Sequence, residues 1–230
     1  MNTKIEFLTF FSVLILGTDK AFSQSTYQWG ILPSLNLNSK LKKDWSLNTK
    51  LESRQIFQSG EVNGEVEGNY KYVQTDLSLI AAKKVGLNSR VGGGYLVRLK
   101  EGELFHRFIQ QYNVVQKLSG FRLAHRFVTD QTFSASEKPE FRVRYRVSSE
   151  IPLNGESVDP GEWYLKLNNE YLYSTQASES DLEIRVVPLL GYDISENLKW
   201  ETGLDYRASS VFKNNKQHSY WVTLNFYIEI

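Results

Sequence analysis

Polar and apolar residues alternate along most of the chain, and segment 140–150 (EFRVRYRVSSE) shows the pattern best. Arg142, Arg144 and Arg146 are separated by aromatic or aliphatic residues. A period of two predicts a strand with one apolar face and one guanidinium face. The same pattern predicts eleven strands, at 26–38, 45–58, 69–83, 89–100, 105–117, 121–133, 140–152, 162–174, 182–194, 198–210 and 218–230.

The connections between these segments also form a pattern. Short ones such as KVGLN and LSG alternate with longer polar ones such as SASEKP and TQASESD, while LNGESVDPGE is a long connection where a short one is expected. Short turns at one end and long loops at the other are typical of outer-membrane barrels. The sequence therefore predicts an all-β fold over residues 24–230, a single antiparallel up-and-down transmembrane β-barrel. Because such barrels have an even number of strands, we expect ten or twelve, with twelve preferred.

Alternation alone does not tell a membrane barrel from a soluble sandwich or a lipocalin-like barrel. The aromatic residues favour the membrane, because Trp45, Phe121, Trp163 and Trp200 each stand at the start of a strand, just after a turn on the short-turn side. Aromatic rings at one level are typical of a membrane interface. These four residues form the expected aromatic girdle.

If the apolar faces meet lipid, the arginines of segment 140–150 point into the barrel, where they need acidic partners. Symmetric connections place Asp130 opposite Arg142, Glu170 opposite Arg144, and Arg185 opposite Glu170. We therefore predict a structural network of charges in the lumen, with Arg144 and Glu170 within hydrogen-bonding range. Its members are Asp130, Arg142, Arg144, Arg146, Glu170 and Arg185.

Composition narrows the class further. Lys and Arg number 27 against 26 Asp and Glu, so the chain lacks the large positive charge that would favour a nucleic-acid partner. The absence of cysteine excludes disulfides and thiol chemistry. Residues 1–23 combine Lys4, the apolar run FLTFFSVLIL and Ala21-Phe22-Ser23, which predicts a cleaved signal peptide.

Candidate chemistry is sparse. The three histidines are His106, His125 and His218, and the predicted register separates the first two too widely to share a metal ion. No serine lies in a G-x-S-x-G motif, and the glycines of VGGGY (91–95) lack the lysine and the helix of a phosphate loop. The sequence therefore indicates no catalytic residue, no metal and no cofactor.

Several short motifs occur in a characteristic order. They are Trp29, Arg54 after LNTKLES, HRFIQQ (106–111), RVRYR (142–146), IPL (151–153), NNEYLY (168–173), Arg185 and LLGY (189–192). Together they resemble the domain-of-unknown-function 2490 family of Gram-negative outer-membrane β-barrels. The resemblance implies an architecture and no reaction. The Ser23–Gln24 cleavage point is similar to signals common in Bacteroidota.

These observations predict a small bacterial outer-membrane protein with a structural or narrow-pore role. Its expected partners are outer-membrane lipid and, during biogenesis, the barrel-assembly machinery, and its oligomeric state is left open. Two alternatives stay open: an outer-membrane lipid-modifying enzyme and a soluble periplasmic lipocalin-like binding protein.

Overall fold

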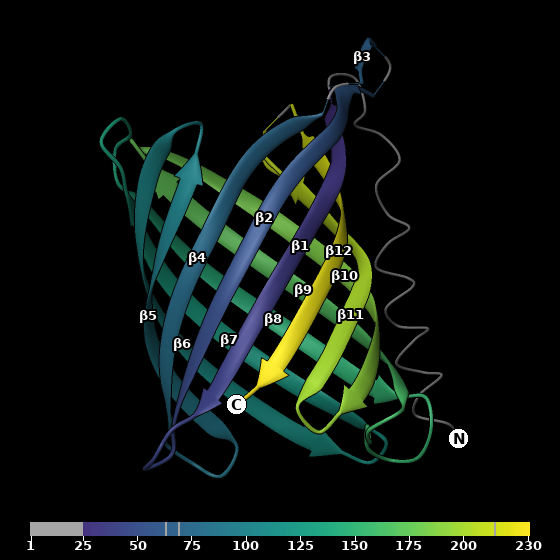
Figure 1. Ribbon diagram of the computed structural model, residues 1–230. Coiled ribbons are helices and arrows are strands. Elements are labelled where there is room, and N and C mark those ends of the chain that lie inside the picture. Colours follow the sequence, from purple (N-terminus) through teal and green to yellow (C-terminus); the bar gives the residue numbers. More distant parts are fainter. Residues whose placement is uncertain (1–24, 63, 69, 214) are drawn as a thin grey trace.

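The computed structural model describes residues 25–62, 64–68, 70–213 and 215–230 (Figure 1). The predicted signal peptide, 1–23, lies outside these residues. Most of the described chain is extended. The strands are β1 (Thr26–Lys40), β2 (Trp45–Glu61), β3 (Val66–Glu67), β4 (Lys71–Lys84), β5 (Ser89–Lys100), β6 (Glu103–Leu118), β7 (Phe121–Phe133), β8 (Glu140–Pro152), β9 (Trp163–Gln176), β10 (Glu179–Ser195), β11 (Leu198–Ser209) and β12 (Gln217–Glu229).

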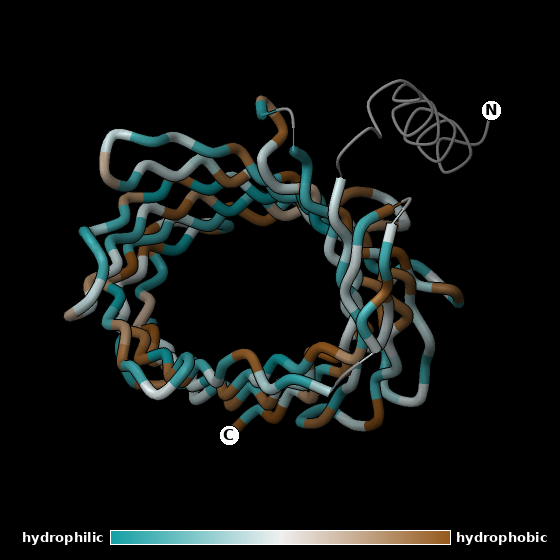
Figure 2. Tube along the Cα trace, turned by 90° about the horizontal axis from the view of Figure 1, so that it is seen from above, coloured by the Kyte–Doolittle hydropathy of each residue, from teal (hydrophilic) through white to brown (hydrophobic). Residues whose placement is uncertain are grey.

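The long strands close into a barrel. Each pairs antiparallel with the next long strand along the chain, and β1 pairs with β12 to complete the ring seen in Figure 2. The closing pair is parallel, from Thr26 opposite Gln217 to Asn38 opposite Glu229. The described residues thus form a closed all-β barrel of eleven long strands, to which the two-residue β3 adds a short extension on β2.

This closure corrects two expectations. The even strand number is wrong, because a parallel closing pair joins an odd number of strands, and the sheet is mixed instead of wholly antiparallel. Pro33 does not exclude β1 from the sheet. The pairing of β1 with β2 omits Leu32 and Pro33 and resumes at Ser34, so the missing N–H of proline falls in a local gap.

The barrel has two ends, which we call the β3 end and the C-terminal end (upper and lower in Figure 1). TQASESD is not the loop we expected, since β9 and β10 continue to a two-residue turn. In that turn Ala177 and Ser178 have φ of 53° and 70°, as the mirror-image turns of tight hairpins require. The β3 end therefore carries tight turns as well as loops, with connections at 62–70, 101–102, 134–139, 177–178 and 210–216.

The two faces of the strands are as predicted. In β2, Lys50, Glu52 and Arg54 line the interior, and the intervening Leu51 is exposed on the outer wall. Gly191 shows how tightly the interior is filled, because a Cβ there would lie 2.2 Å from the ring of Tyr164. Among the described residues, no helix is long and apolar enough to cross a membrane.

Candidate functional site

Three cavities adjoin one another along the inside of the barrel. The central one, of ≈ 290 Å³, shares Arg126 and Arg146 with a cavity of ≈ 600 Å³ at the C-terminal end. It shares Arg98 and Arg107 with a cavity of ≈ 180 Å³ at the β3 end. Arginines therefore stand at both junctions of a series of cavities that extends from one end of the barrel toward the other.

The carboxylate of Asp130, on β7, is fully buried and meets three arginines. Arg142 Nε and Arg144 Nη2 each lie 2.7 Å from its oxygens, and Arg107 Nε lies 3.5 Å away. Arg107 comes from β6 and the other two from β8, so the carboxylate joins three neighbouring strands. A carboxylate removed from water is stable only when it is paired in this way.

Glu170, on β9, repeats the arrangement. Its carboxylate accepts from Arg146 Nε at 2.7 Å, Arg185 Nη1 at 3.1 Å and Arg126 Nη2 at 3.4 Å. Arg185 also pairs with Glu183, its neighbour on β10. We call these six arginines, three around each carboxylate, the arginine wall: Arg107, Arg126, Arg142, Arg144, Arg146 and Arg185.

The predicted network is therefore brought together, with one error of register. Asp130 lies opposite Arg142 and Glu170 opposite Arg185, as the sequence predicts. Glu170 lies opposite Arg146 instead of Arg144, so the predicted Arg144–Glu170 contact is wrong, and Arg144 binds Asp130. The ten-residue connection 153–162 is the physical reason, because a long loop does not determine which residues of β8 and β9 face each other.

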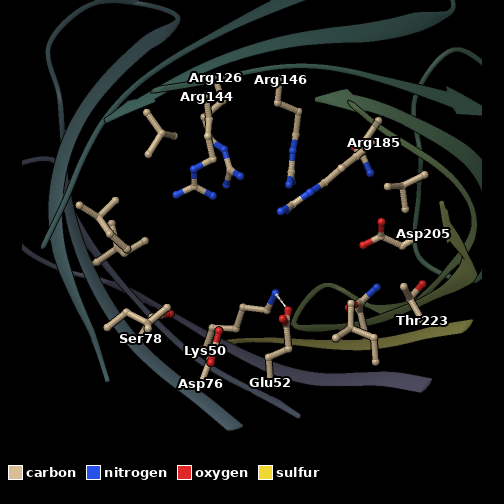
Figure 3. Close-up of a pocket in the computed structure, with 18 of the residues that line it drawn as sticks. Lys50, Glu52, Asp76, Ser78, Arg126, Arg144, Arg146, Arg185, Asp205 and Thr223 are labelled. Atoms are coloured by element: carbon tan, nitrogen blue, oxygen red, sulfur yellow. Dashed lines mark hydrogen bonds and ion pairs between the residues drawn. The ribbon is translucent and has the colours of Figure 1, made fainter. Parts of the chain in front are cut away.

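Smaller ion pairs line the rest of the interior, on β2, β4, β5 and β11, which we call the opposite wall. Arg98 binds Asp76 on the neighbouring strand at 2.7 Å, and Arg207 binds Asp205 on its own strand at 2.7 Å. Figure 3 shows Lys50, Glu52 and Asp76 on this side, across the cavity from the arginine wall. Here the charges nearly balance.

A fifth buried carboxylate, Glu201 on β11, has different partners. Its oxygens accept from Lys166 Nζ at 2.7 Å and from the hydroxyls of Tyr164 at 2.9 Å and Tyr227 at 3.0 Å. One cation and two neutral donors therefore neutralise and satisfy Glu201. This cluster joins β9 to β11 and β12 across the inner face of β10.

The predicted network left out two of the six arginine-wall residues, Arg107 and Arg126, and the ion pairs of the opposite wall. Arg107 and Arg126 occur in the same tripeptide, His-Arg-Phe, at 106–108 and 125–127, and both point inward. Their alternation with outward Phe108 and Phe127 was the available signal. The interior charges outside the predicted network are Lys50, Glu52, Arg54, Asp76, Arg98, Arg107, Arg126, Lys166, Glu201, Asp205 and Arg207.

The four girdle residues lie at the C-terminal end, each at or near the start of a strand, on the outward-facing side of the alternation. The rings of Trp163 and Trp200 are 5.7 Å apart, and the Trp45 ring has Lys83 Nζ 5.8 Å from its centroid. Phe121 begins β7 at the same end. The structure thus places the four aromatics at one end of the barrel, as the sequence predicts.

Each histidine lies beside a tyrosine of a neighbouring strand. Nδ1 lies 2.5, 2.8 and 2.9 Å from the hydroxyl oxygen in the pairs His106–Tyr95, His125–Tyr145 and His218–Tyr206. The rings of each pair stack. In the part of the chain that the structure describes, no cluster of three or more His, Cys, Asp or Glu could hold a metal ion.

The chain, a closed β-barrel in its described residues, belongs to a family whose function is not known. Residues 29–219 match the family described as protein of unknown function DUF2490. No curated protein and no solved structure matches the chain.

Proposed function

We propose that this protein is a bacterial outer-membrane β-barrel whose interior is a narrow, charged passage. Its partners would be outer-membrane lipid and, during biogenesis, the barrel-assembly machinery of a Gram-negative cell, with Bacteroidota as the favoured source. The observation that carries the proposal is the polarity of the two faces of the barrel, which is the reverse of that in a soluble protein. Charges line the inside, and large apolar side chains cover the outside.

The outer wall supports a lipid environment. Phe127 and Val222, near the middle of their strands, are 49% and 48% exposed, and similar side chains surround the barrel. A soluble monomer rarely exposes so extensive an apolar surface. In a membrane the same surface meets hydrocarbon over a band of about 25 Å, while barrel closure satisfies the strand hydrogen bonds.

Aromatic residues near both ends agree with this placement. The girdle of Trp45, Phe121, Trp163 and Trp200 lies at the C-terminal end, and the Trp29 and Phe57 rings pack 5.3 Å apart at the β3 end. Trp29 also donates its indole N–H to Gln58 at 2.7 Å. Rings with a polar edge suit the two interfaces of a bilayer.

One outward-facing cluster near mid-strand is polar, and its groups satisfy each other. The amides of Gln110 and Gln131 donate to one another at 3.2 and 3.1 Å, and Thr129 donates to Gln110 at 2.9 Å. A reciprocal pair of this kind lowers the cost of facing hydrocarbon, because the donors that would otherwise be unpaired are bonded. The cluster is therefore compatible with the proposed environment.

A substitution on the outer wall tests the membrane. Val222→Arg should lower the free energy of unfolding in lipid vesicles by ~2–4 kcal/mol, because a charge near the midplane must leave water. Val222→Leu is the matched control. If Val222→Arg costs less than about 0.5 kcal/mol, as expected for an arginine in water, the outer wall is solvated and the soluble periplasmic alternative holds.

Fractionation and conductance test the location and the passage. We expect the protein to require detergent for extraction from outer membranes and, after reconstitution, to give small, steady currents across a planar bilayer. Recovery from soluble periplasm would contradict the location. A membrane-bound barrel without current would contradict the passage, and turnover of added lipopolysaccharide or phospholipid would favour the lipid-modifying enzyme instead.

A further inference from the structure

The central cavity carries more positive than negative charge. Eleven of the residues lining it are Lys or Arg, and four are Asp or Glu. Adding Asp130 and Glu170, together with Glu140 and Glu183, which also pair with lining arginines, raises the acids to eight. Three cations are still in excess, and the arginine wall accounts for most of the imbalance.

The excess is concentrated where Arg126, Arg144 and Arg146 approach the lumen. Arg126 and Arg146 are directly opposite each other on β7 and β8, and Arg144 is on the same face of β8, two residues away. Figure 3 shows the three side chains reaching inward from one wall. Glu170 Oε2 lies between Arg126 and Arg146 and offsets one of these charges. Like charges opposite one another in a sheet repel, so the remaining positive charge favours a further anion on the lumen side.

Several buried guanidinium groups in the wall have donors to spare. Arg126 Nε, Arg142 Nη2 and Arg144 Nε are buried without a hydrogen-bond partner, so three donors stand against one acceptor in the wall, Asp130 Oδ2, that also lacks one. Each arginine already binds a carboxylate through another nitrogen, so these atoms are not needed to hold Asp130 or Glu170. An unsatisfied buried donor is costly, and a ligand that accepts hydrogen bonds removes the cost.

We propose that the arginine wall is a binding site for a small oxyanion of the phosphate class, held chiefly by Arg126, Arg144 and Arg146. A phosphate group offers several strong acceptor oxygens, and the planar fork of arginine matches it. The central cavity of ≈ 290 Å³ admits inorganic phosphate or a small phosphorylated solute. Access is from either end, through the junctions at Arg98 and Arg107 or at Arg126 and Arg146.

The site deepens the proposed function, since it names the class of solute that the passage takes, and its role in transport rests on that function. Binding of the oxyanion does not rest on that function. It depends on the interior of the folded barrel and needs no membrane. A binding assay therefore distinguishes a failure of the site from a failure of the passage.

The test uses the refolded full barrel in a maltoside detergent, which contains no phosphate. Thermal unfolding is followed while sodium phosphate replaces sodium chloride at constant ionic strength. Phosphate should raise Tm in a saturable manner, and Arg126→Gln should weaken the apparent affinity about tenfold, the effect of losing one charge-assisted hydrogen bond. Lys83→Gln removes a positive charge from the outer wall and should leave the phosphate effect unchanged.

Arg126 is the variant of choice because its bond to Glu170 is the longest of the three, and Arg146 and Arg185 continue to hold that carboxylate. Arg144→Gln is the second variant, should the first fail to refold. The proposal is overturned if phosphate stabilises the wild type no more than chloride does. Equal phosphate effects in Arg126→Gln and the wild type also overturn it.

A second arm separates a free solute from a lipid headgroup. Dioctanoyl phosphatidic acid, added to the micelles in place of inorganic phosphate, should give no shift that depends on Arg126. A lipid shift that Arg126→Gln abolishes, without one for inorganic phosphate, would contradict the proposed solute. In a planar bilayer, reversal potentials should show selectivity for anions, and this selectivity should be weaker in Arg126→Gln. Binding without current refutes the passage alone.

Discussion

The two walls of the interior neutralise their buried carboxylates in different ways. On the arginine wall, Asp130 and Glu170 each hold three arginines, so positive charge is left over. In the rest of the interior, Asp76 and Asp205 each bind one arginine, and Glu201 binds one lysine and two tyrosines. Each buried acid there is close to neutralised by its own partners.

The difference separates two roles that buried charges can have. Balanced pairs fill the interior and satisfy one another, apart from the buried Nε of Arg54. In an unbalanced wall like charges repel one another, and some hydrogen-bond donors have no partner in the protein. Only a ligand or water can satisfy those donors. The balanced wall is therefore structural, and the arginine wall is where we expect binding.

The largest effect should come from Glu170→Gln. The substitution removes the charge that three arginines share and leaves them uncompensated in a buried place, so the free energy of unfolding should fall by about 3–5 kcal/mol. Urea unfolding in micelles, followed by tryptophan fluorescence, measures it. A loss below 1 kcal/mol would mean that water, and not Glu170, solvates the arginine wall.

Glu201→Gln should have a smaller effect, of about 2 kcal/mol. The amide oxygen still accepts one hydrogen bond, and the change leaves only one cation, Lys166, without its partner. The same urea titration applies. If Glu201→Gln costs as much as Glu170→Gln, the number of cations around a carboxylate does not set its contribution, and the contrast between the walls disappears.

The smallest effect on stability should come from Arg126→Gln. Losing its weak contact to Glu170 is offset by relief of repulsion from Arg146, so the net change should stay within about 1 kcal/mol. Arg146→Gln is the comparison, since it removes the shorter bond to Glu170 and should cost more. If Arg126→Gln lowers the free energy of unfolding by more than 2 kcal/mol, Arg126 is needed for stability and is not an excess charge kept for a ligand.

Much of the fold could be predicted from local patterns. The alternation assigned Arg142, Arg144 and Arg146 to the interior, because a strand has only two faces and one of them was apolar. The connection 134–139 was symmetric enough to place Asp130 opposite Arg142. The pairing of Glu170 with Arg146 instead of Arg144 could not be predicted, since it depended on where the ten-residue loop 153–162 closes.

The sequence by itself determined the extended segments, the polarity of each face and the need for the inward arginines to find acidic partners. Only the tertiary structure decided the parallel closure of β1 on β12, the grouping of three arginines around each of two carboxylates, and the excess charge that results. The reason is physical. Face polarity is a property of neighbouring residues, whereas register and closure depend on strands far apart in the chain, which meet only when the barrel is complete.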